Sequence, residues 1–192
     1  MPDHDRGVPD ELWATFEAEV LPHADRMFRV AMWWERDRSE AEDLVQDALL
    51  QALRSFHRFT IGTNCRAWLL TILQHVRSNR RRAKLRRQTL EDPSDQIAET
   101  VPFVPPVPQQ LTDDDVLTAL RGIPQPYQDI ILLSDVEELT YREIASVLDI
   151  PIGTVMSRLH RGRALLRVQL ASRRRVESAA GGADRTSAPE TT

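Results

Sequence analysis

A proline-rich stretch over residues 89–112 divides the sequence into two segments of helical pattern. Proline removes a backbone donor and disfavours helix at the residue before it, so the stretch is predicted to be a flexible linker. Each flanking segment must then bury a core of its own. Aromatic residues make up only 6% of the chain, which suits helices better than sheets. The sequence therefore predicts an all-α fold of two small domains, residues 10–88 and 113–171, with disordered ends at 1–9 and 172–192.

The first domain has its clearest helical pattern in SEAEDLVQDALLQALRSF, which begins at Ser39. Ser39 is a predicted N-cap, and Glu42 three residues later completes a capping box. Apolar residues then recur at helical spacing from Leu44, as in a helix with one buried face. After a break at Gly62, a long helix starts near Cys65. Its first half is apolar and its second half is mostly arginine, so one end is predicted to enter the core and the other to meet solvent or a polyanion.

The second domain is predicted to begin with a short capped helix. Thr112 can act as the N-cap, and the acids Asp113 to Asp115 follow in the first turn, where the helix dipole favours them. Gly122 is a stop signal for this helix. The next helix is predicted to have proline at its start.

A helix-turn-helix follows in the pattern of LTYREIASVLDIPIGTV. Thr140 and Glu143 form the predicted capping box of a short helix that ends near Leu148. Asp149 lies at the sharp turn, where a left-handed backbone is expected and Asp tolerates it. Pro151 then starts the second helix at once.

The second helix of this motif has two different faces. Val155, Leu159 and Gly162 fall on one face, which is predicted to pack on the preceding helix. The other face carries Ser157, His160, Arg161 and Ala164. A recognition helix reads base edges with its N-terminal residues, and arginine can donate two parallel hydrogen bonds to guanine or phosphate. The predicted base readers are Thr154, Ser157, Arg158 and Arg161, whereas Arg163 and Arg167 are predicted phosphate contacts.

Positive charge is concentrated in two runs, although the net charge of the chain is -4. Residues 77–87 hold seven basic residues and no acid, and residues 158–175 hold seven arginines and no acid. Basic clusters of this kind on helices are typical of phosphate binding. The simpler alternative is that both runs are solvated helix faces. We expect nucleic acid as a partner.

No pattern in the sequence predicts an active site, a metal site or a bound cofactor. Acids from Glu40 to Asp47 share one helix, but no histidine with ligand spacing accompanies them. The histidines are scattered, and neither a nucleophile–base pair nor a glycine-rich phosphate loop is visible. We therefore expect a chain that is not an enzyme and takes no small-molecule substrate.

Two features suggest the cytoplasm as the compartment. Cys65 is the only cysteine, which excludes an internal disulfide and fits reducing conditions. No apolar run reaches the roughly 20 residues that span a bilayer, and the polar N-terminus does not resemble a signal peptide.

The stretch LTYREIASVLDIPIGTVMSRLHRGRALLR resembles the promoter-binding C-terminal domain of bacterial sigma factors of the extracytoplasmic-function (ECF) type. AEDLVQDALLQAL resembles the helix that this family docks on the clamp of RNA polymerase, and CRAWLLTIL resembles the next helix of the family. The resemblance covers about residues 10–170, with both domains and the linker in the expected order. It implies a factor that binds the clamp and flap regions of core RNA polymerase and starts transcription at specific promoters.

The resemblance also implies a division of labour among residues. The residues implied to bind the polymerase clamp are Glu42, Asp43, Leu44, Gln46 and Asp47. Those implied to recognise and melt the −10 promoter element are Phe56, His57, Phe59, Asn64, Trp68, His75, Asn79, Arg80 and Arg81. Those implied to read the −35 element as duplex are Tyr141, Arg142, Thr154, Ser157, Arg158, Arg161 and Arg163.

An anti-sigma factor is a further partner that the resemblance implies, and such a protein could hold the chain at the membrane. The alternative function is a stand-alone helix-turn-helix regulator that binds duplex DNA without polymerase. That alternative leaves the acidic helix and the arginine-ended helix unexplained. A pure interaction module is a third class, and the two basic runs argue against it.

Overall fold

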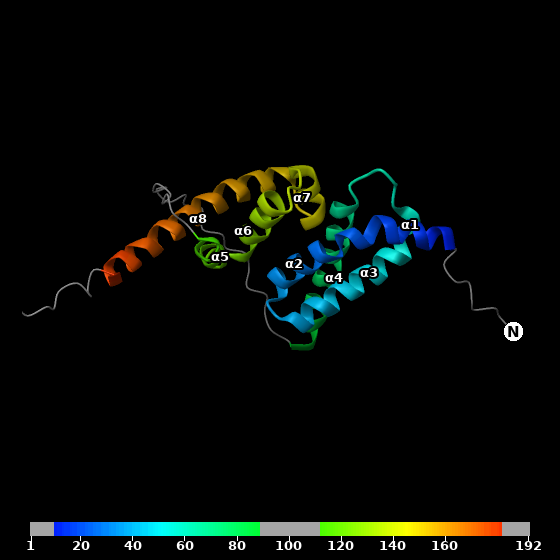
Figure 1. Cartoon of the computed structure of the whole chain (residues 1–192), viewed down its shortest axis with the longest axis horizontal. Helices are drawn as coiled ribbons and strands as arrows, with labels where there is room; N and C mark the ends of the chain where they lie inside the picture. Colours follow the sequence, from blue (N-terminus) through cyan, green and yellow to red (C-terminus); the bar gives the residue numbers. More distant parts are fainter. Residues whose placement is uncertain (1–9, 89–111, 182–192) are drawn as a thin grey trace, which may run out of the picture. The chain divides into compact units, whose positions relative to one another are not determined.

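The computed structural model of the chain describes residues 10–88 and 112–181, with side chains for residues 11–86 and 112–172. All regular secondary structure within these ranges is helical, which confirms the predicted all-α fold (Figure 1). The predicted linker lies outside the described residues except for Thr112, and so do residues 1–9 and 182–192.

The chain divides into two compact units. Within the described ranges, the first unit contains residues 10–88 and 142–150, and the second contains residues 112–141 and 151–181. The segment 142–150 was expected in the second domain from the sequence.

The first unit is a bundle of helices. Its elements within residues 10–88 are α1 (Asp10–Val20), the 3-10 turn η1 (Leu21–His23), α2 (Ala24–Glu35), α3 (Arg38–Ser55), the 3-10 turn η2 (Phe56–Arg58) and α4 (Cys65–Gln88). Helix α3 packs against both α2 and α4. Most of the apolar stripe of α3 that begins at Leu44 is buried, as its helical spacing predicts, whereas Leu49 and Leu53 are partly exposed. The larger side chains that share this core include Val20, Met27, Val30, Leu69, Leu70 and Leu73.

Helix α3 begins before the position predicted from the sequence. Its N-cap is Asp37, whose Oδ1 accepts a hydrogen bond of 2.9 Å from the backbone N–H of Glu40. The predicted cap at Ser39 is therefore wrong, and Ser39 lies inside the first turn. The reason is the tight end of α2: Arg36 takes a left-handed φ of 59° and its N–H closes on the carbonyl of Met32, so the chain enters α3 at once.

The second unit contains α5 (Asp113–Arg121), α6 (Gln125–Ile131), the π turn η3 (Leu132–Val136) and α8 (Ile152–Gly181). Thr112 caps α5 in a full capping box with Asp115, which confirms the predicted start of this helix. The backbone N–H of Glu137 donates to the carbonyl of Leu132, five residues earlier, and this bond makes the turn after α6 wider than an α-helical turn.

Helix α8 packs on α6 and α5 through a close backbone approach at Gly162. A Cβ at this position would lie 3.2 Å from Cδ1 of Ile131 and 3.2 Å from Cβ of Tyr127. Val155 and Leu159, on the same face as Gly162, are also buried, as predicted. The prediction for Ala164 is wrong, because its side chain is buried rather than facing outward.

The two helices of the predicted helix-turn-helix are both present. The first is α7 (Tyr141–Leu148), and α8 begins at Ile152. Asp149 between them has a φ of 53°, which confirms the left-handed turn expected there. The carbonyl of Pro151 accepts from the N–H groups of Thr154 and Val155, so the proline opens the first turn of α8.

Helix α8 extends beyond Ser172, where the sequence analysis placed the start of a disordered tail. Its backbone remains helical to Gly181. The added stretch RRRVESAAG consists mostly of residues that tolerate or favour helix, and glycine is a common helix end.

Candidate nucleic-acid and polymerase interface

Four polar residues lie exposed along α3: Glu42, Asp43, Gln46 and Asp47. We call them the α3 patch. They recur at helical spacing opposite the buried stripe, so α3 presents three carboxylates to solvent. Leu44, implied to bind polymerase, is instead fully buried in the core. It can support the patch but cannot contact a partner while the bundle is intact.

Arg80 of α4 connects the α3 patch to the basic run. Its Nη2 and Nε donate to Oδ2 of Asp47, at 2.5 and 3.1 Å, and Nη2 also donates to the backbone carbonyl of Asp43 at 2.9 Å. The side chains of Arg80 and Asp47 remain 34% and 51% exposed. The sequence placed these residues in two different binding sites, and the structure brings them together.

The segment after α3 is anchored by a cluster of aromatic rings. Phe56 is buried, with its ring centroid 5.2 Å from that of Phe16 and 5.7 Å from that of Phe59. The rings of Phe59 and Trp68 lie 4.9 Å apart, and both are half-buried. Phe56, which the resemblance assigned to the melted strand, is therefore a core residue. The rings of Phe59 and Trp68 remain partly accessible to solvent.

The polar members of the same segment lie at its two ends. His57 is exposed in η2, and Asn64 is exposed at the start of α4. Oδ1 of Asn64 accepts a hydrogen bond of 3.2 Å from the N–H of Ala67, so Asn64 caps α4. Gly62 between them takes a φ of 88°, a backbone conformation that favours glycine.

The basic run of α4 divides into an anchored and an exposed part. Arg77, its first member, is buried: its Nε lies 3.3 Å from Oε1 of Glu35, and its guanidinium lies 4.8 Å from the ring centre of Trp34. It fixes α4 to α2 and is not available to DNA, which corrects the assignment of the whole run to DNA. Four exposed cations follow: Arg81, Arg82, Lys84 and Arg86. We call them the α4 cationic end.

His75 and Asn79 also lie exposed on α4. Oδ1 of Asn79 accepts a hydrogen bond of 3.2 Å from Nη2 of Arg82, which places the amide beside the α4 cationic end. These two residues and the cations thus lie along one exposed stretch of the helix.

The predicted base readers lie in the first turns of α8. Ser157 is exposed, and Thr154, Arg158 and Arg161 are partly exposed. The hydroxyl of Ser157 donates to the carbonyl of Thr154 at 3.1 Å, so its oxygen remains able to accept from a ligand. On the preceding helix, Tyr141 and Arg142 are exposed.

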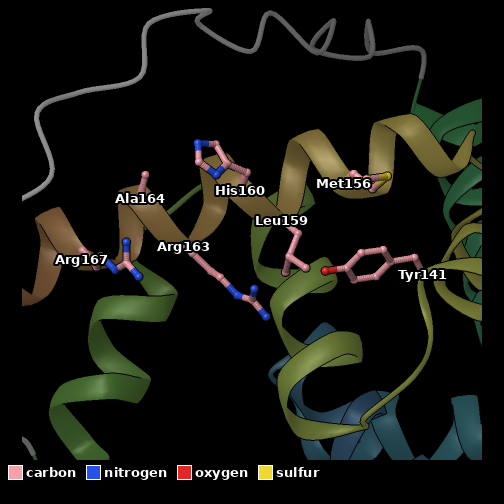
Figure 2. Close-up of a pocket in the computed structure, with 7 residues that line it drawn as sticks. All are labelled: Tyr141, Met156, Leu159, His160, Arg163, Ala164 and Arg167. Carbon is pink, nitrogen blue, oxygen red and sulfur yellow. The ribbon is translucent and has the colours of Figure 1, made fainter.

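A shallow pocket of about 330 Å³ lies on the surface of α8. Its lining residues are Tyr141, Met156, Leu159, His160, Arg163, Ala164 and Arg167. Figure 2 shows Met156, His160, Arg163 and Arg167 on successive turns of α8, with Tyr141 facing Leu159. The lining combines cationic, aromatic and apolar groups, so it suits an anionic or mixed surface better than a purely apolar ligand.

Arg163 donates hydrogen bonds to the carboxylate of Asp135, a partner that the sequence did not predict. Its Nη2 lies 2.6 Å from Oδ1 of Asp135 and its Nε lies 3.3 Å from Oδ2 of the same residue. This hydrogen bonding with Asp135 is the main cause that raises the pKa of Arg163. No local pattern could have revealed the partner, because it lies 28 positions away in the π turn.

Within the described part of the chain, no group of three or more His, Cys, Asp or Glu residues could hold a metal ion. Over the same residues, no helix is long and apolar enough to cross a membrane. Cys65 is buried in the first unit, and burial raises the pKa of its thiol to about 11.

Two family matches cover most of the described chain. Residues 20–87 match Sigma-70 region 2, and residues 113–166 match Sigma-70, region 4. The first range includes the α3 patch and most of α4, and the second ends within α8. The alternative of a stand-alone regulator is not favoured, because it gives no role to a region 2 domain.

Several known sigma factors are similar to this chain. It is 35% identical over 159 residues to the ECF RNA polymerase sigma factor SigE of Mycolicibacterium smegmatis, in an alignment that covers 79% of this chain and 60% of SigE. It is 33% identical over 142 residues to the ECF RNA polymerase sigma factor EcfG of Rhodopseudomonas palustris, in an alignment that covers 73% of this chain and 76% of EcfG. The chain thus spans less than two thirds of SigE but about three quarters of EcfG.

A solved structure with the same fold is the sigma factor RpoE in complex with the anti-sigma factor NepR from Bartonella quintana. The TM-score is 0.64 at 29% identity, and the match covers 82% of this chain and 97% of that chain. Family matches, relatives and fold agree with the family predicted from the sequence. The chain belongs to the ECF family of RNA polymerase sigma factors, which are DNA-binding transcription initiation factors rather than members of a known enzyme class.

Proposed function

We propose that this chain binds core RNA polymerase and directs it to specific promoters, where transcription starts. The observation that carries the proposal is the presence of Sigma-70 regions 2 and 4 in one chain and in that order. A chain with both regions can engage the polymerase and two separate promoter elements. The proposal further holds that the chain is not an enzyme and requires no cofactor.

The α3 patch is the proposed contact with the polymerase clamp. Its members Glu42, Asp43, Gln46 and Asp47 are exposed on the helix that resembles the clamp-docking helix of the family. Carboxylates on an exposed helix face attract a basic partner surface and orient its approach. Leu44 acts behind them, as a core residue that keeps α3 in place.

The segment from Phe56 to Asn64 and the adjoining α4 are the proposed contacts with the melted −10 element. A base taken out of the duplex stack needs a ring to stack on and polar groups along its edge. The half-buried rings of Phe59 and Trp68 can provide the first, and His57 and Asn64 can provide the second. The α4 cationic end, with His75 and Asn79 beside it, would then hold the strand backbone.

The first turns of α8 are the proposed reader of the duplex −35 element. Thr154, Ser157, Arg158 and Arg161 lie at the end of a recognition helix that meets base edges in this motif. Tyr141 and Arg142 are proposed to contact the phosphate backbone. Arg163 is proposed as a phosphate contact as well, although Asp135 already engages part of its guanidinium.

An anti-sigma factor is proposed as the regulatory partner, because RpoE is held by NepR in the similar solved structure. The proposed compartment is the cytoplasm, where core RNA polymerase and promoter DNA are found. An anti-sigma factor with a membrane anchor would hold the chain at the membrane until it is released.

Reconstituted transcription tests this proposal. Core RNA polymerase, the purified chain and a pool of promoter fragments should give transcripts from discrete start sites only when the chain is present. The sequences upstream of those sites should share two spaced elements. Specific retention of duplex DNA by the chain alone, with no transcripts, would contradict the proposal in favour of a stand-alone regulator.

A further inference from the structure

The ion pair between Arg80 and Asp47 joins the two surfaces that the proposed function assigns to different ligands. Asp47 belongs to the α3 patch, which is proposed to meet the polymerase. Arg80 precedes the α4 cationic end, which is proposed to meet the promoter strand. A ligand that takes these groups competes with the pair, because Nη2 and Nε of Arg80 both donate to Oδ2 of Asp47.

We propose that this pair couples the two binding events in the first unit: when the polymerase engages Asp47, Arg80 is released toward the promoter strand, and the reverse also holds. The inference rests on the proposed function, because it takes its two ligands from there. It adds a mechanism by which the chain binds the strand better on polymerase than alone.

The pair between Arg80 and Asp47 has several hydrogen bonds, but its exposure to solvent allows a ligand to displace either partner. Arg80 has three donor contacts, two to the carboxylate of Asp47 and one to the backbone carbonyl of Asp43. However, a third of the Arg80 side chain and half of the Asp47 side chain are exposed. Water and salt weaken pairs with this exposure, so a basic polymerase surface or a phosphate can displace either partner.

The sign of the coupling follows from linkage. Each ligand alone must open the pair, whereas the second ligand meets a pair that is already open. The coupling is therefore positive and reciprocal. Exposed ion pairs of this kind correspond to a factor of about two to five in affinity, and the coupling cannot exceed that factor.

The basic test is a set of affinities for purified core RNA polymerase, measured by anisotropy of the full-length chain labelled at its N-terminus. Arg80→Gln should bind polymerase about two to five times more tightly than the matched control Arg29→Gln, because only the first frees Asp47. Arg29 is an exposed arginine on α2 with no assigned binding role, so its replacement makes the same change in charge. In an Asp47→Asn background, the gain from Arg80→Gln should disappear.

The reciprocal measurement adds an oligothymidine single strand as the nucleic-acid probe. The strand should increase the polymerase affinity of the unchanged chain more than that of Arg80→Gln. Urea unfolding followed by circular dichroism checks that each variant is folded. If Arg80→Gln is destabilised, Arg80→Met against Arg29→Met repeats the comparison and keeps the aliphatic part of each side chain.

Three results would overturn the inference. Equal polymerase affinity for Arg80→Gln and Arg29→Gln would leave the pair as a structural contact between α3 and α4. A gain that persists with Asp47→Asn would assign the effect to charge in general. Both results leave the proposed function intact, whereas failure of the unchanged chain to bind polymerase at all would reject the proposed function and the coupling together.

Discussion

Arg163 and Asp135 form a two-point contact in the second unit, with Nη2 to Oδ1 at 2.6 Å and Nε to Oδ2 at 3.3 Å. The contact ties α8 to the π turn after α6. It also distinguishes Arg163 from Arg161, because part of the donor capacity of Arg163 is already used. Arg163 and Arg161 are therefore expected to differ in how they serve DNA binding, although both are arginines on the same helix.

Replacement of Arg161 by alanine should weaken binding to the −35 duplex by about 1–3 kcal/mol if it contacts a base, and only for the correct sequence. Replacement of Arg163 should instead weaken binding to all duplexes alike, as a phosphate contact does. Competition assays with matched and scrambled duplexes, at two salt concentrations, measure both effects on the polymerase-bound chain. A sequence-dependent loss from Arg163→Ala would contradict the role that we give it.

Replacement of Asp135 by asparagine should lower the free energy of unfolding only slightly. The side chains of Arg163 and Asp135 are 45% and 38% exposed, and ion pairs with this exposure contribute about 0.2–1 kcal/mol. Urea unfolding at low and high salt measures the loss. The difference from the unchanged chain should shrink as salt rises, because salt screens the pair in the unchanged chain.

Replacement of Arg77 by alanine should destabilise the first unit by about 1.5–3 kcal/mol, because the carboxylate of Glu35 and the ring of Trp34 lose the buried guanidinium that they contact. Arg81→Ala is the matched control, and as an exposed residue it should change stability by no more than about 0.5 kcal/mol. Urea midpoints of both variants give the comparison. Equal midpoints would mean that Arg77 does not anchor α4.

Replacement of Gly162 by leucine should destabilise the packing of α8 on α6 by about 1–3 kcal/mol, because even a Cβ there approaches Ile131 and Tyr127 to 3.2 Å. Gly153 is the control on the same helix. A Cβ at Gly153 meets nothing within 4 Å, so Gly153→Ala should leave stability unchanged or raise it by up to about 1 kcal/mol. Thermal unfolding followed by circular dichroism separates the two outcomes.

The thiol of Cys65 should make stability fall at alkaline pH. Burial raises its pKa to about 11, whereas the pKa of a free thiol in the unfolded chain is about 8.5. At pH values between these two pKa values, the unfolded chain binds fewer protons than the folded chain, so the free energy of unfolding falls as pH rises. Below the pKa of the unfolded thiol, this group does not change the free energy of unfolding. Cys65→Ala should remove that part of the pH dependence in urea titrations. Iodoacetamide at pH 8 should modify Cys65 slowly until the chain is unfolded.

Local patterns predicted local structure well in this chain. The capping box at Thr112 and the left-handed turn at Asp149 depend on a few adjacent residues, and both are present. The cap of α3 was placed wrongly, because Ser39 matches a capping motif but Asp37 comes first in the chain and its side chain caps the helix. A capping motif alone does not show which of two candidate residues caps the helix, because this also depends on where the preceding helix ends.

Contacts between distant segments account for the errors about which side chains are buried or paired. A run of arginines gives no sign that Arg77 is buried against Glu35 or that Arg80 reaches Asp47. Likewise, a helical wheel for α8 alone could not show that Ala164 is buried, because its burial depends on how the rest of the chain packs around the helix. Charge runs therefore indicate a nucleic-acid partner, but only the fold separates cations that hold the protein together from those that remain exposed.

The π turn at Leu132–Val136 bears on how sequences of this kind can change in length. A turn closed by a bond between residues five apart holds one residue more than an α-helical turn. Loss of one residue there can restore the ordinary helical bonding without changing the direction of the segments on either side. Elsewhere in α6 or α8, the same loss would rotate every later side chain by about 100° and turn buried positions toward water. The loss of one residue is therefore expected to destabilise the second unit less in the π turn than inside α6 or α8.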